Sequence, residues 1–473
     1  LSFTPGTWVE SIQITKGAGS VVNGYESISG QINTELIKPI NDIPFFLNAY
    51  GSTDSRFELN THFNTQLSQK WSSSLFVHGN TRVSKMDQNN DGFMDNPLAK
   101  QINVMNRYQY YDAEKGLVSF INFRYMNDKK QSGEVDFDPD RDRGATNRWG
   151  SEINTQRLDL ATKVGYVFKD MPFQSIGFQN AFTLHNQNSY YGLNVYDIKQ
   201  SSFYSNLIFN SIINNTKHKF ATGINFAYDN YNEFVGLTDY GRVDNSVGTF
   251  FEYTYDNDDN FSLVLGGRVD NHNRLGTFVT PRLHLRYNPW EKSVLRFSAG
   301  RGKRAANIFA ENQSLFASSR TFSILDTDGK IYGLNPEIAW NYGLSFNQKF
   351  QLFGRNGDAG FDLYRTDFQN QAVVDVMQSP QQVLFYNLKG KSYATSLQIE
   401  FNYELANRFS LRSAYKYYDI QTQYLSGVYQ RPLQAKHRFF GNLEYETGRS
   451  ESGSQWRFDA TYNWLGKQQL PVT

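Results

Sequence analysis

The most specific chemical motif in this 473-residue chain is an acidic loop, D-Q-N-N-D-G-F-M-D, at residues 87–95. Its spacing is that of the first half of an EF-hand loop, in which side-chain and backbone oxygens surround a calcium ion. The expected ligands are four side chains and one backbone carbonyl: Asp87, Asn89, Asp91 and Asp95, with the carbonyl of Phe93. Leu98 stands where an EF-hand carries its bidentate glutamate, so a solvated turn is the alternative interpretation. The sequence predicts a candidate calcium loop here and no other cofactor.

A second group of residues could bind a small ligand. Aromatic and basic side chains gather near the ends of predicted strands, and recognition sites favour tyrosine, tryptophan and arginine. The candidates are Trp149, Tyr190, Tyr191, Arg301 and Arg304. The two arginines could attract an anionic chelate. The alternative is that the aromatic residues form a membrane-interface girdle and that the arginines are only hydrated.

Catalysis is not indicated by any motif in the chain. G-x-S-x-G, H-E-x-x-H and P-loop sequences are absent, and the seven histidines lack zinc-ligand spacing. The chain has no cysteine, which excludes disulfides, thiolate metal sites and thiol catalysis. With 47 basic and 46 acidic residues, it lacks the charge that favours nucleic acid. We therefore expect neither an enzyme nor a nucleic-acid-binding protein.

The elements that must position these residues are β-strands. In residues 456–464, Trp456, Phe458, Tyr462 and Trp464 share one face, and polar residues occupy the other. Such alternation recurs through most of the chain, while no apolar run of about 18 residues could form a membrane-crossing helix. Aromatic residues make up 16% of the chain. A wall that faces lipid outside and water inside has this pattern, which is typical of a transmembrane β-barrel.

About nineteen strands are predicted between residue 41 and the end of the chain. Their approximate spans are 43–53, 56–67, 71–83, 104–112, 116–128, 153–168, 174–187, 199–212, 217–232, 244–255, 261–272, 278–288, 293–301, 338–350, 358–370, 391–403, 408–420, 435–446 and 455–464.

The connections between these strands differ in length in a regular way. Even-to-odd connections such as 68–70, 113–115 and 214–216 are short, whereas the others are mostly long: 84–103, 129–152, 188–198, 302–337, 371–390 and 421–434. Outer-membrane barrels have short periplasmic turns and long extracellular loops. The acidic loop and the candidate ligand residues are therefore expected on the extracellular side. Because bacterial single-chain barrels have even strand numbers, we expect about 22 strands in the full protein, with the last strands missing here.

The N-terminal residues resemble part of a known family. Residues 9–39, V-E-S-I-Q-I-T-K-G-A-G-S-V-V-N-G-Y-E-S-I-S-G-Q-I-N-T-E-L-I-K-P, are similar to the end of the plug domain of TonB-dependent outer-membrane receptors. Gly17, Gly24 and Gly30 match the glycines of that motif. Residues 268–270 (R-V-D), 280–282 (T-P-R) and 334–337 (L-N-P-E) resemble motifs of the family's barrel. The resemblance implies the C-terminal part of a plug at residues 1–40 and an all-β, antiparallel barrel at residues 41–473.

The resemblance also implies a function. Such a receptor is integral to the bacterial outer membrane, binds a scarce extracellular ligand, and imports it with energy from the TonB–ExbB–ExbD complex, which acts on an N-terminus absent from this sequence. An iron–siderophore chelate is the first candidate cargo, with cobalamin, copper or a glycan as rivals. Lipid and lipopolysaccharide would surround a monomeric barrel. A passive porin or an adhesin-type barrel is the alternative. The sequence leaves open the cargo, the presence of a TonB box or signal peptide, and any lipoprotein partner.

Overall fold

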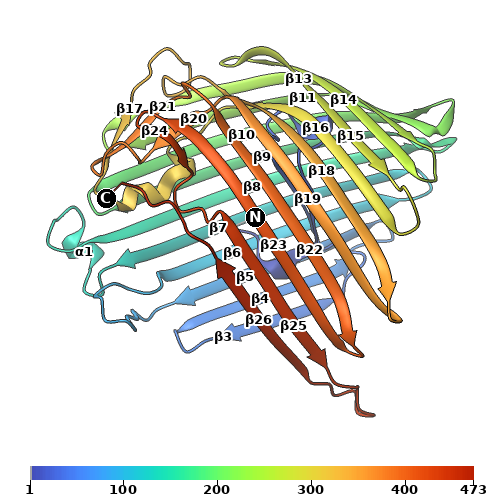
Figure 1. The fold of residues 1–473 in the computed structure, drawn as a ribbon, viewed down its shortest axis with the longest axis horizontal. Helices are drawn as coiled ribbons and strands as arrows, with labels where there is room; N and C mark the ends of the chain where they lie inside the picture. Colours follow the sequence, from blue (N-terminus) through green and yellow to red (C-terminus); the bar gives the residue numbers. More distant parts are fainter. Residues whose placement is uncertain (1–2, 473) are drawn as a thin grey trace.

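The computed structural model describes residues 3–472, most of which form one large antiparallel β-sheet wall (Figure 1). The wall consists of β3 (Phe45–Gly51), β4 (Arg56–Gln66), β5 (Trp71–Arg82), β6 (Leu98–Asp112), β7 (Leu117–Gly133), β8 (Gly150–Phe168), β9 (Met171–Tyr191), β10 (Asn194–Ile213), β11 (Asn215–Val235), β12 (Thr238–Asp239), β13 (Arg242–Asp256), β14 (Phe261–His272), β15 (Gly276–Tyr287), β16 (Ser293–Arg304), β18 (Glu337–Leu352), β19 (Arg355–Asn370), β22 (Ser392–Ala406), β23 (Phe409–Tyr424), β24 (Gly427–Gln430), β25 (His437–Glu446) and β26 (Arg457–Leu465).

The remaining elements lie inside the wall or in its connections. They are η1 (Gly6–Trp8), β1 (Val9–Lys16), η2 (Val21–Asn23), β2 (Gly30–Leu36), α1 (Pro139–Asp142), η3 (Ala310–Ala317), β17 (Thr321–Ile324), β20 (Ala372–Asp375) and β21 (Gln382–Asn387). Among residues 3–472, no helix is both long enough and apolar enough to cross a bilayer.

The strands follow one another around a barrel, and the strand order places β26 beside β3. Residue pairings continue without interruption from β3 to β26. Apart from the short β12 and β24, nineteen barrel strands lie in the described part of the chain, and each overlaps one predicted span. The all-β barrel prediction is confirmed. β26 is exposed along its whole length, so this junction is the least covered part of the wall.

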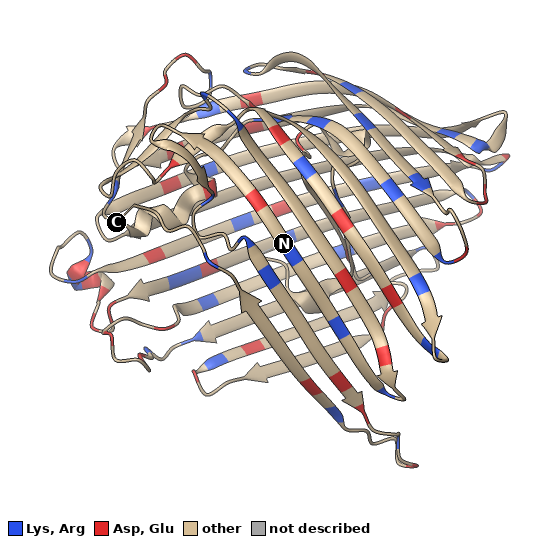
Figure 2. Cartoon of the chain, in the orientation of Figure 1, with Lys and Arg blue, Asp and Glu red and all other residues tan. Residues whose placement is uncertain are grey.

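The two faces of the wall differ as the alternation requires. Arg282 is 3% exposed on the lumen side, whereas Phe458 and Tyr462 on the outside are 57% and 62% exposed. Charged side chains occur along the strands as well as in the loops (Figure 2). A soluble sandwich would bury the aromatic face instead, because apolar surface is removed from water wherever the fold allows.

One predicted long loop is wrong. Residues 188–198 are almost entirely strand, because β9 and β10 continue to a two-residue turn, Gly192-Leu193. Gly192 has φ +60°, and a Cβ there would lie 2.8 Å from the Trp149 indole nitrogen. β6, β7 and β8 also extend beyond their predicted ends. A strand of about 9–11 residues suffices to cross a bilayer, so these hairpins are longer than a crossing requires, and the alternation that predicts strand ends does not extend through them.

The long connections fold into a structure that we call the loop cap, residues 305–336 and 371–391. Strands β17, β21 and β20 of the cap form a small separate sheet, gathered at one end of the wall (Figure 1). The side chains of Phe309, Phe316 and Phe385 are about 1% exposed or less and pack with Tyr196 of β10. The cap therefore has a hydrophobic core of its own, anchored on the wall.

The N-terminal segment, residues 3–40, lies in the lumen and contains one hairpin, β1–β2. Its Trp8 side chain is 1% exposed and packs against Phe76 and Met105 of the wall. Backbone carbonyls of the segment accept hydrogen bonds from inward-facing side chains: Val21 from Arg268 (3.1 Å), Gly19 from Arg282 (2.6 Å), Leu36 from Arg107 (3.2 Å) and Phe3 from Arg124 and Asn103. The predicted domain boundary at residue 40 falls between β2 and β3, and the assignment of two domains stays a prediction.

Two glycines of the wall make room for this segment. A Cβ at Gly300 would lie 2.4 Å from the Ala18 side chain, and a Cβ at Gly266 would lie 2.9 Å from that of Val21. Any side chain at either position would push the segment away from the wall. We call these two positions the glycine slot.

We expect Arg268→Met to destabilise the protein strongly. Arg268 and Asp270 form a fully buried pair at 2.6 Å, so the variant leaves a buried carboxylate without its counter-charge. Breaking such a pair costs about 3–5 kcal/mol. The measurement is thermal unfolding in detergent, with Arg457→Met as control because the Arg457–Glu446 pair is largely exposed and contributes about 0–1 kcal/mol. Equal losses in both variants would contradict the expectation.

Candidate functional site

A cavity of about 580 Å³ lies beneath the loop cap, against the inner face of β19, β22 and β23. Its walls combine apolar side chains, such as Leu315, Val376 and Ile420, with a few charged ones. The charged residues that line it are Arg304, Glu311, Arg320, Glu337 and Arg431. Ligand sites in proteins are typically concave, largely apolar and of about 300–1,000 Å³, with a few polar groups that orient the ligand.

Arg304, at the end of β16, organises the charged side of this cavity. Its guanidinium donates to Glu337 at 2.6 Å and to both oxygens of Glu311 at 2.8 and 2.9 Å. Two carboxylates on one cation leave this side of the cavity with a net negative charge. Arg320 instead donates to carbonyls of the cap, including those of Val376 and Ser379, and so fixes the cap's shape.

Glu26 brings a carboxylate of the N-terminal segment toward the same region. Its side chain lies deep in the lumen, surrounded by the barrel wall, and this desolvation raises the pKa of Glu26. The nearby Arg304 lowers the pKa, and the carboxylates of Asp229 and Glu311 raise it further. Arg304 therefore interacts electrostatically with a carboxylate of the N-terminal segment, of the wall and of the loop cap.

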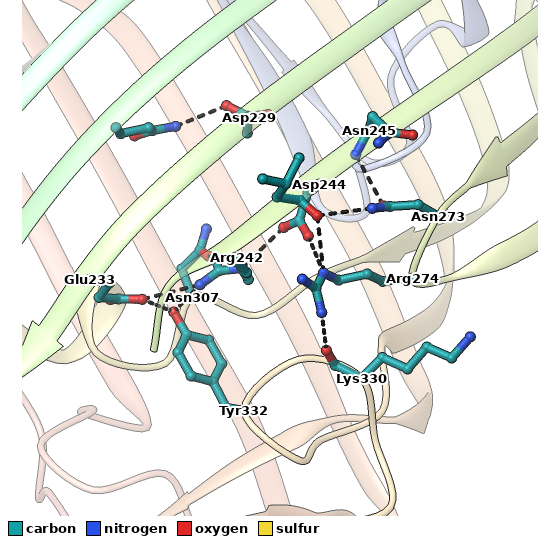
Figure 3. Close-up of polar contacts among 12 residues, drawn as sticks. Asp229, Glu233, Arg242, Asp244, Asn245, Asn273, Arg274, Asn307, Lys330 and Tyr332 are labelled. Carbon is teal, nitrogen blue, oxygen red and sulfur yellow. Dashed lines mark hydrogen bonds and ion pairs between the residues drawn. The ribbon is translucent and has the colours of Figure 1, made fainter. Parts of the chain in front are cut away.

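A buried polar network, which we call the polar latch, fastens residues 305–336 to the wall (Figure 3). Arg242 binds Glu233 at 3.1 Å and Asp244 at 3.1 Å, and donates to the hydroxyl of Tyr332 at 2.7 Å. Arg274 extends the latch through Asp244, at 2.8 Å, to the carbonyl of Lys330 at 2.9 Å (Figure 3). Burial raises the pKa of the Tyr332 hydroxyl, so it stays protonated and donates to Glu233.

Of the five candidate ligand residues, only Arg304 lines the cavity. Tyr190 and Tyr191 are 4% and 7% exposed, and Tyr191 packs on Phe316 of the cap with ring centroids 5.9 Å apart. Tyr190 donates to Glu152 at 2.8 Å, and Trp149 packs at the edge of the cap's core. Tyr191 and Trp149 thus support the cap, whereas Tyr190 contacts Glu152 and the guanidinium of Arg143.

Arg301 lies on the other side of the wall from Arg304. It is paired with Trp340 and donates to the carbonyl of Val279 at 3.0 Å, on the outward face. Alternation along β16 alone predicts that Arg301 and Arg304 lie on opposite faces of the wall. In the structure, the lumen-facing Arg282 pairs with Gly300, so the even-numbered residues of β16 face the lumen. The sequence analysis did not identify Glu311 or Glu337 as residues of the cavity wall, although Glu337 ends the L-N-P-E motif.

In the acidic loop, the carboxylates accept hydrogen bonds from the loop's own amides. Asp87 accepts from Gly92 at 2.9 Å and from Asp91 at 3.1 Å, and Asp91 accepts from Phe93 at 2.8 Å. Asp95 accepts from the amide of Gln88 at 2.9 Å. In the described residues, no three His, Asp or Glu side chains are arranged to hold a metal ion. Asn89 also contacts Asp91. The calcium interpretation stays a prediction.

The three motif glycines occupy tight positions of the N-terminal segment. Gly17 has φ +81°, and a Cβ there would lie 2.7 Å from the Ser298 hydroxyl. Gly24 has φ +121°. A Cβ at Gly30 would lie 2.8 Å from the Thr15 carbonyl oxygen. Their role is to shape the segment's turns and its contact with the wall.

If the acidic loop binds calcium, the ion should protect it from protease. Wild-type protein with 1 mM calcium, a concentration on the order of the weakest extracellular sites, is compared with protein in chelator by limited proteolysis. The expected result is faster cleavage near residues 84–97 in chelator, and no chelator effect in Asp87→Ala/Asp91→Ala. A wild type that ignores chelator would eliminate the site.

Arg242→Met should release the loop cap. The change leaves Glu233, 1% exposed, without its buried counter-charge, at a cost of about 3–5 kcal/mol. We expect trypsin to cut after Arg320 or Lys330 much faster than in wild type. Arg355→Met, in a largely exposed pair with Glu404, is the matched control. Unchanged cleavage in Arg242→Met would show that the latch does not hold the cap.

The chain was compared with known families, proteins and structures. The family described as "TonB dependent receptor-like, beta-barrel" matches residues 15–472. No curated protein sequence matches. Among solved structures, a ferric enterobactin receptor variant of Pseudomonas aeruginosa in complex with enterobactin has a TM-score of 0.72 at 11% identity, covering 99% of this chain and 75% of that chain.

Two further structures are similar in fold. The alcaligin outer-membrane receptor of Bordetella pertussis has a TM-score of 0.67 at 12% identity, covering 98% of this chain and 75% of its own. The hemophore receptor of Serratia marcescens, in complex with its hemophore and heme, has a TM-score of 0.69 at 12% identity, covering 97% and 80%. At these identities the structures show the fold alone.

The family match covers nearly the whole chain, and it agrees with the barrel, the segment in its lumen and the absence of catalytic motifs. Members of the family are outer-membrane transporters and not enzymes, as expected from the sequence. The chain belongs to the TonB-dependent receptor β-barrel family.

Proposed function

We propose that this chain is an active-transport receptor, integral to the bacterial outer membrane, that binds a scarce ligand beneath the loop cap and imports it with TonB-coupled energy. The observation that carries the proposal is the combination of a cavity on the long-loop side with a lumen occupied by the N-terminal segment.

The contacts of the segment support energy coupling. Its carbonyls are held by side chains of the wall, and Lys16 forms an ion pair with Asp362 of β19. Hydrogen bonds and ion pairs of this kind exchange readily with water once the partners separate, because their net free energy in water is small. A pulling force can therefore displace the segment, and the TonB–ExbB–ExbD complex would supply it through the N-terminus. A passive porin is less well supported, since its lumen would be open.

An iron–siderophore chelate is the first candidate cargo. The similar structures include receptors in complex with enterobactin, ferripyoverdine and a heme-carrying hemophore. The cavity's size suits a ligand of this class, and its apolar wall with a few polar groups suits a bulky chelate. Cobalamin, copper and a glycan remain as rivals.

The outer wall fits contact with lipid, including lipopolysaccharide. An apolar groove of about 640 Å³ is lined by Phe251, Tyr253, Leu265, Pro281, Leu283, Ala299 and Trp340. Arg301, paired with Trp340, stands at its long-loop end. An apolar groove suits an acyl chain, and a cation beside an interfacial tryptophan suits a phosphate headgroup.

Filling the cavity should abolish uptake. Ala394 is a small residue in the cavity wall, so Ala394→Trp occupies the ligand's space. A deletion strain that carries each variant is supplied with a ferric catecholate, a ferric hydroxamate, cobalamin, Cu²⁺ or a maltodextrin as the single source. We expect one of these probes to be taken up by wild type, at least about tenfold less by Ala394→Trp, and not at all without TonB.

Ala406→Trp, at an exposed position beside a short turn, is the matched control and should retain uptake. Uptake that persists in a strain without TonB would favour the passive porin. Uptake that is equal in both tryptophan variants would place the ligand elsewhere.

A further inference from the structure

One row of inward-facing residues crosses seven neighbouring strands of the lumen wall, from the short-turn end of β15 and β16 to the middle of β18, β19, β22 and β23. Each member is in register with the next: Arg286, Arg296, Ser345, Asp362, Gln398, Lys416 and Arg438. Residues in register share a face of the sheet. Asp362 contacts Lys16 of the N-terminal segment, which places the row on the lumen face. We call its four cationic members the basic collar.

The basic collar contains two like-charged pairs that stand directly opposite each other. Arg286 is paired with Arg296, and Lys416 with Arg438. Directly opposed residues have Cβ atoms only about 4.5–5.5 Å apart, and like charges at that spacing destabilise a sheet. Folding alone gives no reason to place four cations in this way.

The surrounding acids are fewer than the cations: Glu400 lines the cavity beside Lys416 and Arg438, where Arg412 adds a further cation. In the described residues, no ion pair joins any of its four cations to a carboxylate, since Asp362 is taken by Lys16. Asp256, at the other end of the row, is separated from Arg286 by Ser262 and therefore lies about 9–10 Å away. The Nε atom of Arg438 is buried and has no hydrogen-bond partner.

The collar borders three neighbouring cavities, two of which are also lined by the N-terminal segment. A cavity of about 480 Å³ is lined by Arg286, Arg296, Ser298 and Lys16. The next, of about 310 Å³, shares Lys16 and Asp362 with it and reaches Lys416. A third, of about 490 Å³, shares Lys416 and continues to Arg438. The four cations of the collar thus all face open space in the lumen.

We propose that the basic collar is a binding site for an anionic group, a phosphate or a carboxylate, beside the N-terminal segment. Guanidinium groups bind such oxyanions through two parallel N–H donors, and neighbouring serine hydroxyls can add further donors. The inference rests on the proposed function, because it implies that the imported ligand carries an anionic group that pauses at the collar during its passage.

Binding is tested on the purified full chain in detergent, by calorimetric titration at low salt with pyrophosphate and, separately, with citrate. We expect saturable binding by wild type and an affinity at least about tenfold lower in both Arg286→Gln/Arg296→Gln and Lys416→Gln/Arg438→Gln. The two anions separate a phosphoryl preference from a carboxylate preference. Arg449→Gln/Lys467→Gln removes the same charge at exposed positions and should bind like wild type.

Thermal unfolding distinguishes an anion-binding site from a row of residues that only stabilises the fold. In anion-free buffer, Arg286→Gln/Arg296→Gln should unfold at the same temperature as wild type or higher, because a like-charge repulsion is removed. Pyrophosphate or citrate should raise the unfolding temperature of wild type only. Absence of binding to wild type, equal affinity in all variants, or a lower unfolding temperature of the double variant in anion-free buffer would overturn the proposal.

The collar is separated from the cavity under the cap with Ser314→Trp, because Ser314 lines that cavity and none of the three beside the collar, whereas Ala394 also lines the second of these. Ser314→Trp should bind pyrophosphate or citrate like wild type. If its uptake persists while the collar binds anions, the proposed ligand site fails and the collar stands. If uptake is lost but wild type binds neither anion, the collar fails alone.

Discussion

The structure depends on how the wall satisfies the backbone carbonyls of a segment that has little hydrogen-bonded structure of its own. Residues 3–40 form one hairpin and two short 3₁₀ turns, so many of their carbonyls need donors from elsewhere. Arg107, Arg124, Arg268 and Arg282 supply these donors from the wall. The same contacts hold the segment across the lumen, between the wall and the cavities that border the collar.

At the long-loop end, connections that could have been mobile are built into a fixed roof. Phenylalanine packing gives the cap a core, and Arg242 ties it to the wall through Glu233 and Tyr332. Aromatic residues that composition alone would offer to a ligand, Tyr191 and Trp149, instead pack against this cap. The polar groups that remain beside the cavity come from strand ends and from the cap's short helix.

The sequence predicted the wall well because a two-residue repeat and alternating connection lengths are local properties. All nineteen strands were found in this way, but their extensions above the membrane were missed, as were the contacts of the cap. Arg301 and Arg304 illustrate the limit, since their opposite faces follow from alternation whereas their partners do not. The pairing of Arg286 with Arg296 requires the register between strands, which hairpin turns set and which composition does not reveal.

The glycine slot makes the N-terminal segment and the barrel a matched pair. Because a Cβ at Gly266 would lie 2.9 Å from Val21 and a Cβ at Gly300 would lie 2.4 Å from Ala18, steric fit as well as hydrogen bonding determines which segment the lumen accepts. Chimeras that graft the corresponding segment of a distant homologue into this barrel would clash unless the residues opposite the slot were small, so the two parts are under pressure to diverge together.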